Sequence, residues 1–210
     1  MPGPKCKICR RAGQKLFLKA ERCSGAKCGA VRRPYPPGVH GQKSRRSNSE
    51  FGKQLAEKYK LEAVYQIDEK DLKHIVAVDP VNLAKKKMEI TDVIVNSLES
   101  RLDNVVFRLG MAPSRIVARQ YVSHGHIYVN NRRVDIPSSK VRSGDVVSIR
   151  PSSMKRGPFQ NLSARLDKHT PPAWLEVDKQ SLKGKVIGIP GKENFDAPVD
   201  LSMIVAFYSR

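Results

Sequence analysis

The stretch that decides the fold runs from position 99 to position 145 and reads ESRLDNVVFRLGMAPSRIVARQYVSHGHIYVNNRRVDIPSSKVRSGD. Apolar residues recur in its first part at the spacing of one helix face: Leu102, Val105, Val106 and Leu109. Gly110 follows them as a typical helix end. Pro113 and Ser114 are typical of the start of a helix, so a second helix is predicted from there.

The remainder of this stretch has the pattern of short strands. Residues 127–129 are apolar or aromatic and predict a strand, and Asn130-Asn131 predicts a tight turn. A return strand is expected from Arg132 onward, and a further strand is expected over 146–149. Together with the helices, this pattern predicts a unit of two helices packed on a small sheet.

Basic side chains are spread over both predicted helices and over the turns between the strands. On the helices they are seven or four residues apart, so each pair shares a helix face: Arg101 with Arg108, and Arg115 with Arg119. In the turns and strands they are His124, His126, Arg132, Arg133, Lys140 and Arg142. Guanidinium groups match phosphate oxygens, so this frame is predicted to hold folded RNA by its shape and backbone.

An alternative interpretation is that these are ordinary surface arginines, several of them paired with Asp103 or Asp135. Surface ion pairs contribute at most about 1 kcal/mol each, and they would not explain the surplus of positive charge. RNA contact is therefore the favoured interpretation.

The positive charge of the whole chain is large and unevenly distributed. The 210 residues carry 39 Lys and Arg against 20 Asp and Glu, a net charge of +19. The first 60 residues hold sixteen basic and three acidic side chains, a net of +13, and the other 150 hold twenty-three and seventeen, a net of +6. So basic an arm favours a polyanionic partner. Solubility alone is the weaker explanation, because acidic residues serve it better.

All four cysteines lie near the start of the chain, at Cys6, Cys9, Cys23 and Cys28. Two close pairs separated by a loop suit a tetrahedral site, and the spacing predicts one Zn²⁺ per chain. An iron–sulfur cluster also uses four thiolates and is the main alternative. Two disulfides would fit a secreted protein, but the beginning of this chain has no secretory signal. A redox-active pair would be expected within a strand–helix pattern, which the sequence lacks here.

The arm continues through a segment rich in Pro, Gly and Ser, which reads RRPYPPGVHGQKSRRSNS. Three prolines within four residues impose an extended path, and such a segment cannot bury its charges. The predicted RNA-contacting residues of the arm are Lys7, Arg10, Arg11, Lys15, Lys19, Arg22, Arg32, Arg33, Tyr35, His40, Lys43, Arg45 and Arg46. Tyr35 has two equally weighted interpretations, stacking on a base or packing on a neighbouring proline.

Helices are predicted after the arm. Ser47 with Glu50 has the spacing of a capping box. Apolar residues then recur every four positions and predict one buried face: Phe51, Leu55, Tyr59 and Ala63. A second helix is expected to start at Asp68. No apolar run reaches the 18 residues that a membrane-spanning helix needs, so no membrane partner is expected.

These observations predict an α+β chain with a small metal-bound N-terminal arm, a helical body, and an inserted unit of two helices and a small sheet. The expected division is a zinc-binding basic arm and linker over 1–46, a helical body over 47–97, an RNA-binding module over 98–150, and a C-terminal part over 151–210 that returns to the helical body.

The stretch quoted first resembles the RNA-binding module named after the fourth protein of the small ribosomal subunit. Pseudouridine synthases and other RNA enzymes carry this module as well. The four-cysteine arm, RRPYPPGVHGQK, the capped helix and the terminal AFYSR occur in the order of the bacterial family of that ribosomal protein. The chain is therefore similar to this family over nearly its whole length, and to its zinc-binding form.

The resemblance implies a function that composition does not show. Such a protein binds small-subunit ribosomal RNA at a multi-helix junction and nucleates assembly of the subunit body. With neighbouring ribosomal proteins it lines the channel by which messenger RNA enters, and it influences translational accuracy. Some relatives also bind their own messenger RNA. The implied location is the ribosome in the cytoplasm, with no small-molecule substrate.

Two other functions compete with this interpretation. An RNA-modifying enzyme with the same module would need a catalytic domain, and no catalytic motif is present in the residues that remain. A zinc-dependent DNA-binding regulator would need a recognition helix, which the Pro-rich segment after the cysteines does not offer. The expectation is a non-catalytic ribosomal protein.

Overall fold

The computed structural model describes residues 5–43, 49–77 and 89–209. Contacts divide the chain into two compact units. The first consists of Met1–Ile94 with Asp196–Arg210, and the second of Val95–Phe195. The predicted combination of helices with a small antiparallel sheet is confirmed, while the metal-bound state of the arm stays a prediction. No helix among the described residues is both long and apolar enough to cross a bilayer.

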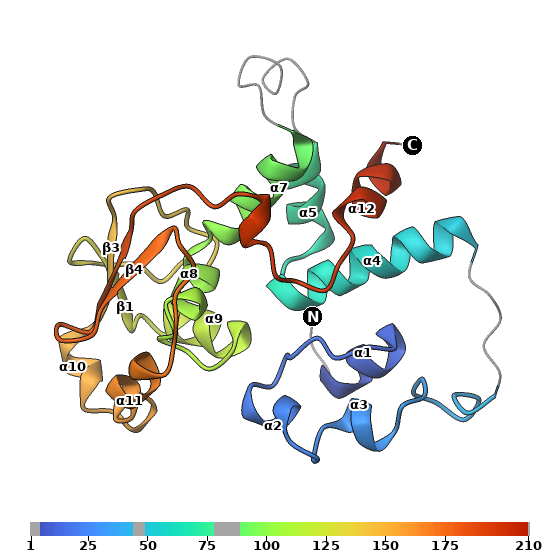
Figure 1. Ribbon diagram of the computed structural model, residues 1–210, viewed down its shortest axis with the longest axis horizontal. Coiled ribbons are helices and arrows are strands. Elements are labelled where there is room, and N and C mark those ends of the chain that lie inside the picture. The colour runs from blue at the N-terminus through green and yellow to red at the C-terminus, as the bar shows by residue number, and fades with distance from the viewer. Residues whose placement is uncertain (1–4, 44–48, 78–88, 210) are drawn as a thin grey trace. The chain divides into compact units, whose positions relative to one another are not determined.

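The first unit begins with three short helices that carry the cysteines (Figure 1). Helix α1 spans Lys5–Ala12, α2 spans Glu21–Ser24 and α3 spans Gly29–Arg32. Helix α1 packs on α3, and few apolar side chains are buried here: Leu16 and Leu18 accompany the cysteines. An arm with so small a core depends on other contacts or on a cross-link for its stability.

Three further helices among the described residues belong wholly to the first unit. Helix α4 spans Glu50–Tyr65, α5 spans Glu69–Val76 and α12 spans Leu201–Tyr208. The last helix packs on the first two, so the end of the chain returns to the helices that follow the arm. Helix α7, Ile90–Glu99, crosses the division between the units.

The prediction for α4 was partly wrong. Ser47 lies outside the described residues, and the observed N-cap is Ser49, whose Oγ accepts a hydrogen bond from the Gly52 amide. Phe51 and Tyr59 are about half exposed (48% and 49%), although they were expected to be buried. The buried side instead includes Lys58, because its ammonium pairs with Glu62, one turn further along α4, and with Glu69 at the start of α5. Spacing alone cannot predict that a lysine stands on the buried face.

The second unit contains the predicted pair of helices and a sheet of five strands. Helix α8 spans Leu102–Arg108 and α9 spans Arg115–Ser123. The helix end at Gly110 is confirmed by its φ of 78°, and Ser114 is the N-cap of α9. The strands are β1, Ile127–Val129; β2, Arg132–Arg133; β3, Val146–Ile149; β4, Leu175–Asp178; and β5, Lys183–Val186.

All neighbouring strands are antiparallel, in the order β2-β1-β3-β5-β4. The tight turn between β1 and β2 is confirmed, because Asn130 and Asn131 both have positive φ (50° and 62°), as a type I′ turn requires. Strands β4 and β5 were not predicted. They place much of 151–195 in the second unit, whereas only 196–210 packs with the helical body. The predicted segment boundaries themselves stay a prediction.

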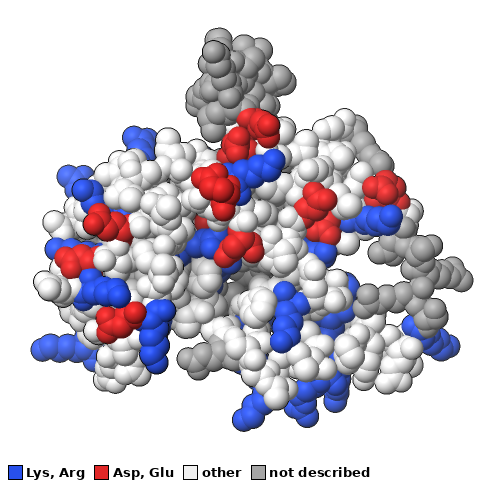
Figure 2. All heavy atoms as spheres, viewed as in Figure 1, with Lys and Arg blue, Asp and Glu red and all other residues white. Residues whose placement is uncertain are grey.

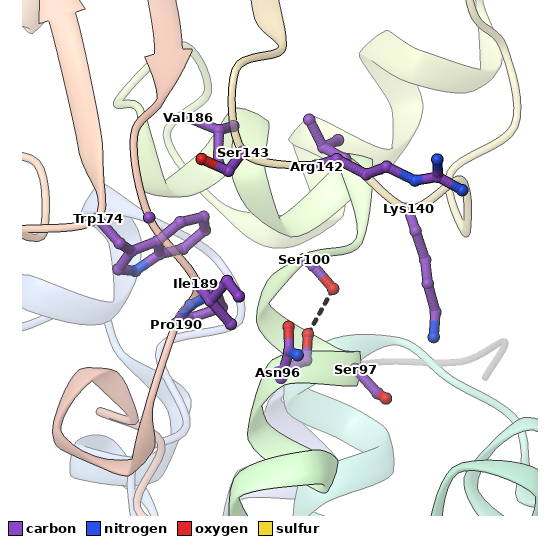
Figure 3. Close-up of a pocket in the computed structure, with 12 residues that line it drawn as sticks. Asn96, Ser97, Ser100, Lys140, Arg142, Ser143, Trp174, Val186, Ile189 and Pro190 are labelled. Carbon is purple, nitrogen blue, oxygen red and sulfur yellow. Dashed lines mark hydrogen bonds between the residues drawn. The ribbon is translucent and has the colours of Figure 1, made fainter. Parts of the chain in front are cut away.

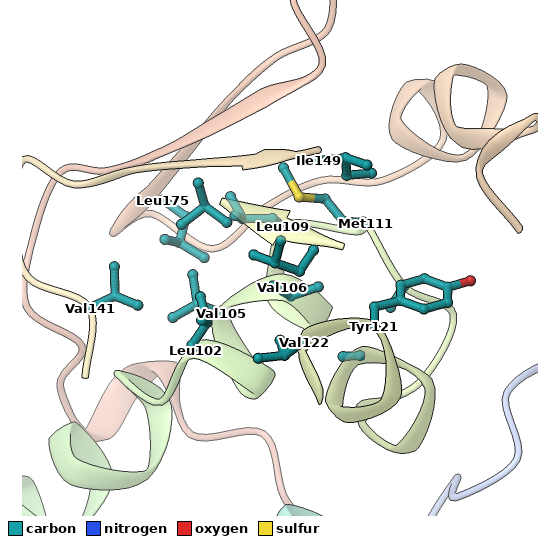
Figure 4. Packing of buried hydrophobic residues seen from close by; sticks show 14 of the residues in the cluster. Leu102, Val105, Val106, Leu109, Met111, Tyr121, Val122, Val141, Ile149 and Leu175 are labelled. Carbon is teal, nitrogen blue, oxygen red and sulfur yellow. The ribbon is translucent and has the colours of Figure 1, made fainter. Parts of the chain in front are cut away.

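The core of the second unit lies between the two helices and the sheet. Figure 4 shows Val105, Val106 and Leu109 of α8 directed toward the strands. Side chains from helix α11, Leu162–Asp167, complete this cluster. At Gly184 of β5 a Cβ atom would lie 2.4 Å from Leu109 Cδ2, so only glycine allows α8 to pack this closely.

Short segments connect the sheet to the rest of the second unit. Helix α10 spans Pro151–Met154, and single 3₁₀ turns occupy Gly157–Phe159 and Lys192–Asn194. Phe159 packs against Tyr121 of α9 with ring centroids 4.7 Å apart. The turn at Phe159 is thereby packed against α9.

Candidate nucleic-acid interface

The cations of the arm form an exposed surface with almost no acidic residue in it. Glu21 is the only acidic residue between positions 5 and 43. The face drawn in Figure 2 shows basic and neutral residues over α1–α3, while acidic and basic residues alternate over the sheet unit. The exposed members of the predicted set are Lys7, Arg11, Lys19, Arg22, Arg32, Arg33, His40 and Lys43, and Lys15 is partly buried. Arg45 and Arg46 lie outside the described residues.

Arg10 has a structural role instead. Its Nε atom donates to the carbonyl oxygens of Arg33 (3.1 Å) and Tyr35 (2.9 Å), and Nη2 donates to Pro36 O (3.3 Å). The same guanidinium lies over the Tyr35 ring, 4.9 Å from its centroid. One face of Tyr35 is therefore occupied by a cation, which neither sequence interpretation foresaw. Arg10 thus fixes the Pro-rich segment against α1.

The four cysteines lie close together, but not in a metal-binding arrangement. All four thiols are free, and Cys9, Cys23 and Cys28 are buried. Within the described ranges, no group of three or more His, Cys, Asp or Glu residues could hold a metal ion. Burial raises the pKa of the Cys9 thiol, and the charges of the other three thiolates raise it further, against a hydrogen bond from the Leu16 backbone that lowers it. The thiol of Cys9 is thus influenced by the other three cysteines.

Backbone donors are directed at two of these sulfurs. The Lys19 amide donates to Cys23 Sγ at 3.2 Å, and the Leu16 amide donates to Cys9. Groups that hydrogen-bond to the ligands of a metal orient those ligands and tune the site. The chemistry of the donor set therefore fits a thiolate-bound metal, although the sulfur positions do not form a closed site.

The helix arginines of the second unit are mostly internal, which contradicts the predicted exposed arginine face. Arg108 is 8% exposed and binds the fully buried Glu99 through two 2.8 Å contacts. Arg101 is 5% exposed and pairs with Asp103 at 3.2 and 3.3 Å. The carboxylates decide this outcome, because a buried acid requires a buried partner. Arg101 and Arg108 are thus positioned for stability rather than for contact with a ligand.

Arg115 and Arg119 join the same two carboxylates from α9. Arg115 donates to Asn104 Oδ1 at 2.8 Å, and its guanidinium lies 4.6 Å from the Phe107 ring centroid. Arg119 lies 3.6 Å from Asp103 Oδ2 and keeps 40% of its side chain exposed. Burial raises the pKa of Asp103, although Arg101 and Arg119 act against that rise. All four helix arginines therefore form ion pairs, as the alternative expected for Asp103, but Arg108 and Arg115 pair with Glu99 instead. Contact of these arginines with RNA stays a prediction.

The predicted cations of the turns are exposed: His124, Arg132, Arg133, Lys140 and Arg142. Among them Arg133 forms an exposed pair with Asp135 at 3.3 Å, which is worth at most about 1 kcal/mol. Strand β2 and the connecting segments, more than the helix faces, thus present the predicted cations of this unit that are accessible. That placement separates the residues available to a ligand from those that hold the fold.

His126 marks a cationic region at the end of α9. Its Nδ1 lies 2.9 Å from Ser153 Oγ, and its ring packs against Phe159. Burial lowers the pKa of His126, and so do the nearby positive charges of Arg156, His124, Arg150 and Arg133. Arg156 was missed because the predicted module ended at position 150, and Arg150, the last residue of that module, was not singled out. Arg150 directly follows a strand, which was the signal that could have included it.

The lowered pKa of His126 predicts how stability depends on pH. Below the usual His pKa of about 6.5, the unfolded chain binds more protons here than the folded protein does, so stability falls as pH is lowered. Urea unfolding between pH 7 and pH 5 should show a smaller loss for His126→Gln than for the wild type. His74→Gln, at an exposed histidine of α5 that is not among the causes of this shift, is the matched control and should retain the wild-type loss. Equal pH dependence in wild type and His126→Gln would contradict this prediction.

Comparisons with known proteins divide the chain near the same position as its two compact units do. A family model described as Ribosomal protein S4/S9 N-terminal domain matches residues 1–98, and one described as S4 domain matches residues 100–147. The small ribosomal subunit protein uS4 of Halothermothrix orenii is 46% identical over 209 residues, which cover 99% of this chain and 98% of that protein. The uS4 protein of Thermus thermophilus shows the same identity and coverage.

The chain belongs to the uS4 family. The matched S4 domain contains α8, α9 and strands β1 and β2, and it extends into β3, so the resemblance drawn from the quoted stretch is confirmed. Strands β4 and β5 lie beyond that match and extend the uS4 sheet on its other edge. The uS4 protein of Syntrophomonas wolfei, 45% identical over 98% of this chain and 96% of that protein, is a further relative that matches both parts.

Proposed function

We propose that this chain binds small-subunit ribosomal RNA as a non-catalytic constituent of the small ribosomal subunit, in the cytoplasm. The observation that carries the proposal is the exposed cationic surface of the arm in a chain that matches ribosomal relatives from end to end. These relatives are ribosomal proteins, so the chain is not an enzyme. Neighbouring ribosomal proteins are its expected protein partners.

The structure supports different roles for the two units in RNA binding. The arm offers guanidinium and ammonium groups to phosphates without acidic neighbours, which suits contact along an RNA backbone. The second unit holds its shape through the buried carboxylates Glu99 and Asp103 and presents cations from its turns. A rigid frame with exposed turns suits recognition of a folded RNA by shape. The proposal also includes three roles that follow from the family. They are assembly of the subunit body, entry of messenger RNA into the subunit, and translational accuracy.

Salt dependence of binding to a transcript of the small-subunit ribosomal RNA tests the proposal. Affinity should fall steeply with salt, with log K changing by about 0.7–0.9 per unit of log salt for each neutralised phosphate. The double variant Arg32→Ala/Arg33→Ala should bind more weakly and with a shallower slope, because both side chains are exposed cations at the end of α3. Filter binding at several salt concentrations measures both effects.

The matched control removes the same charge elsewhere in the first unit. Lys70 and Lys73 are exposed on α5 and are not in the predicted interface, so Lys70→Ala/Lys73→Ala should keep most of the slope. Wild-type affinity that is insensitive to salt would contradict the proposal. Binding to its own messenger RNA, which some relatives show, stays a prediction from the resemblance.

A zinc ion held by Cys6, Cys9, Cys23 and Cys28 is part of the proposed function. Three of these thiols are buried, two accept backbone N–H groups, and the thiol of Cys9 is influenced by the other three cysteines. When bound, zinc would supply the cross-link that the small core of the arm lacks. The alternative occupant is an iron–sulfur cluster, which uses the same thiolates.

A further inference from the structure

A cavity of about 650 Å³ lies in the second unit, and none of the four helix arginines lines it. Figure 3 shows its walls: Asn96 and Ser97 of α7 on one side, Lys140 and Arg142 on another, and Trp174 with Ile189 opposite. Its volume lies within the range of about 300–1,000 Å³ that is typical of small-molecule sites. No family match or relative assigns a role to it.

Hydrogen bonds hold the walls of this cavity in place. The Val141 amide donates to Ser100 O at 2.9 Å, which joins the segment of Lys140 to the end of α7. Ser143 Oγ donates to Ile187 O at 3.2 Å, and the Ile187 amide donates to Trp174 O at 3.0 Å. The cavity is therefore built from three backbone segments that are tied to one another.

The cations of this cavity differ from most other cations of the unit. Arg101, Arg108, Arg115, Arg119 and Arg133 all pair with carboxylates. Within the described part of the chain, Lys140 and Arg142 form no ion pair, and no acidic residue lines the cavity. The Asp145 carboxylate accepts from the Arg142 backbone amide at 2.7 Å, so it is held by the backbone rather than by the guanidinium. Two cationic side chains on one wall, neither in an ion pair, favour an anionic group from a ligand, and phosphate fits a guanidinium especially well.

The opposite wall of the cavity is apolar and is formed mainly by Trp174 and Ile189. Trp174 is only 4% exposed, and among the described residues its Nε1 has no hydrogen-bond partner. Because this atom is closed to solvent, Trp174 contributes apolar packing to the wall rather than a hydrogen-bond donor that faces the cavity. Ile189 is 70% exposed although it is apolar, so it offers a flat contact to a planar group. Asn96 and Ser97 add an amide and a hydroxyl at the α7 side.

We propose that this cavity binds one unpaired nucleotide of the ribosomal RNA. Its phosphate lies on Lys140 and Arg142, its base lies against Ile189 beside Trp174, and Asn96 and Ser97 face the sugar and the base edge. Sequence-specific recognition of RNA usually involves unpaired bases that contact apolar or aromatic side chains. A protein segment would fit the apolar wall but would leave both cations without a counter-charge. The inference rests on the proposed RNA-binding function and adds a defined subsite to it.

Trp174 provides a direct readout because it is the only tryptophan in the chain. Its fluorescence is to be titrated in the full-length protein with a single-stranded ribotetranucleotide and, separately, with a short RNA duplex. The single strand should change the emission in a saturable way, and the duplex should not. Lys140→Ala/Arg142→Ala should weaken the single-strand response at least tenfold. No change of emission with the single strand would overturn the inference.

The control Lys155→Ala/Lys168→Ala removes two exposed cations of the same unit that do not line the cavity. It should retain the fluorescence response within about twofold, since only non-specific attraction is reduced. An equal loss in both double variants would mean general electrostatic attraction rather than a subsite, and would overturn the inference.

Chemical probing of the bound ribosomal RNA transcript separates this inference from the proposed function. Wild type and control should protect one unpaired nucleotide that becomes reactive with Lys140→Ala/Arg142→Ala. If the transcript binds but the two double variants give the same protections, the subsite is refuted and the proposed function stands. If the variant keeps all RNA protections but fails to retain a neighbouring ribosomal protein in small subunits, the cavity binds protein and the inference is wrong. A transcript that does not bind wild-type protein refutes the proposed function itself.

Discussion

Replacing Arg108 with alanine is expected to lower the free energy of unfolding of the second unit by about 3–5 kcal/mol. Glu99 is fully buried, and Arg108 contacts both of its carboxylate oxygens at 2.8 Å. Without Arg108 this buried carboxylate loses its main partner, while the Arg115 guanidinium lies 3.9 Å away. Removing one partner of a buried pair is costly because the other charge stays desolvated. Urea unfolding, followed by Trp174 fluorescence, measures the loss.

Two further variants isolate the cause. Arg133→Ala breaks an ion pair in which both side chains are about half exposed, so it should cost less than about 1 kcal/mol. Glu99→Gln combined with Arg108→Ala removes the buried charge together with its partner and should recover part of the stability. A loss for Arg108→Ala no larger than that for Arg133→Ala would contradict a structural role and would return Arg108 to the candidate RNA contacts.

Arg108 also shows where sequence reasoning reaches its limit at the interface. The spacing of Arg101 and Arg108 placed both on one helix face, but the same spacing describes an exposed face and a buried one. The deciding residue is Glu99, which lies just before α8 and is directed into the unit. Cations in turns were easier to predict, because a turn such as that of Asn130-Asn131 lies on the surface.

The sheet was predicted only where its strands follow a clear pattern. Strands β1 and β3 have apolar residues beside a turn signal, and β2, Arg132–Arg133, follows the turn directly; all three were found. Strand β5 reads Lys183-Gly184-Lys185-Val186, with a glycine where a strand usually carries a branched side chain. That glycine is required by Leu109 of α8, which lies far from it in the sequence. Local propensity therefore could not reveal the second half of the sheet.

The arm was predicted differently, from the chemistry of its residues rather than from periodicity. Its cations are exposed where Pro and Gly prevent a core, as expected for Arg32, Arg33, His40 and Lys43. The exception is Arg10, which binds three backbone carbonyls of the Pro-rich segment. Extended backbone has carbonyl oxygens that no helix or sheet satisfies. A nearby arginine can donate hydrogen bonds to them and so stabilise the segment. The pattern of charges alone does not indicate which arginine will bind backbone carbonyls.

Removal of zinc is expected to unfold the arm while the second unit stays folded. In small zinc domains, metal binding contributes roughly 10–16 kcal/mol to folding, and the arm buries few apolar side chains beyond Leu16 and Leu18. Purified protein should contain about one zinc per chain, and Cys9→Ser should lower metal affinity by several orders of magnitude. Zinc content and limited proteolysis of the arm are the measurements. Trp174 fluorescence reports separately on the second unit.

Loss of the arm's structure should also weaken binding to the RNA. Arg32 and Arg33 lie at the end of α3, whose N-cap is Cys28, so their positions depend on whatever holds that cysteine in place. Cys9→Ser should therefore weaken binding of the ribosomal RNA transcript more than Ser24→Ala, a control at an exposed residue between two of the cysteines. Metal-free protein with a protease-resistant arm and full RNA affinity would refute the zinc proposal. A coloured protein that contains iron and sulfide would instead identify the cluster as the occupant of the same four thiolates.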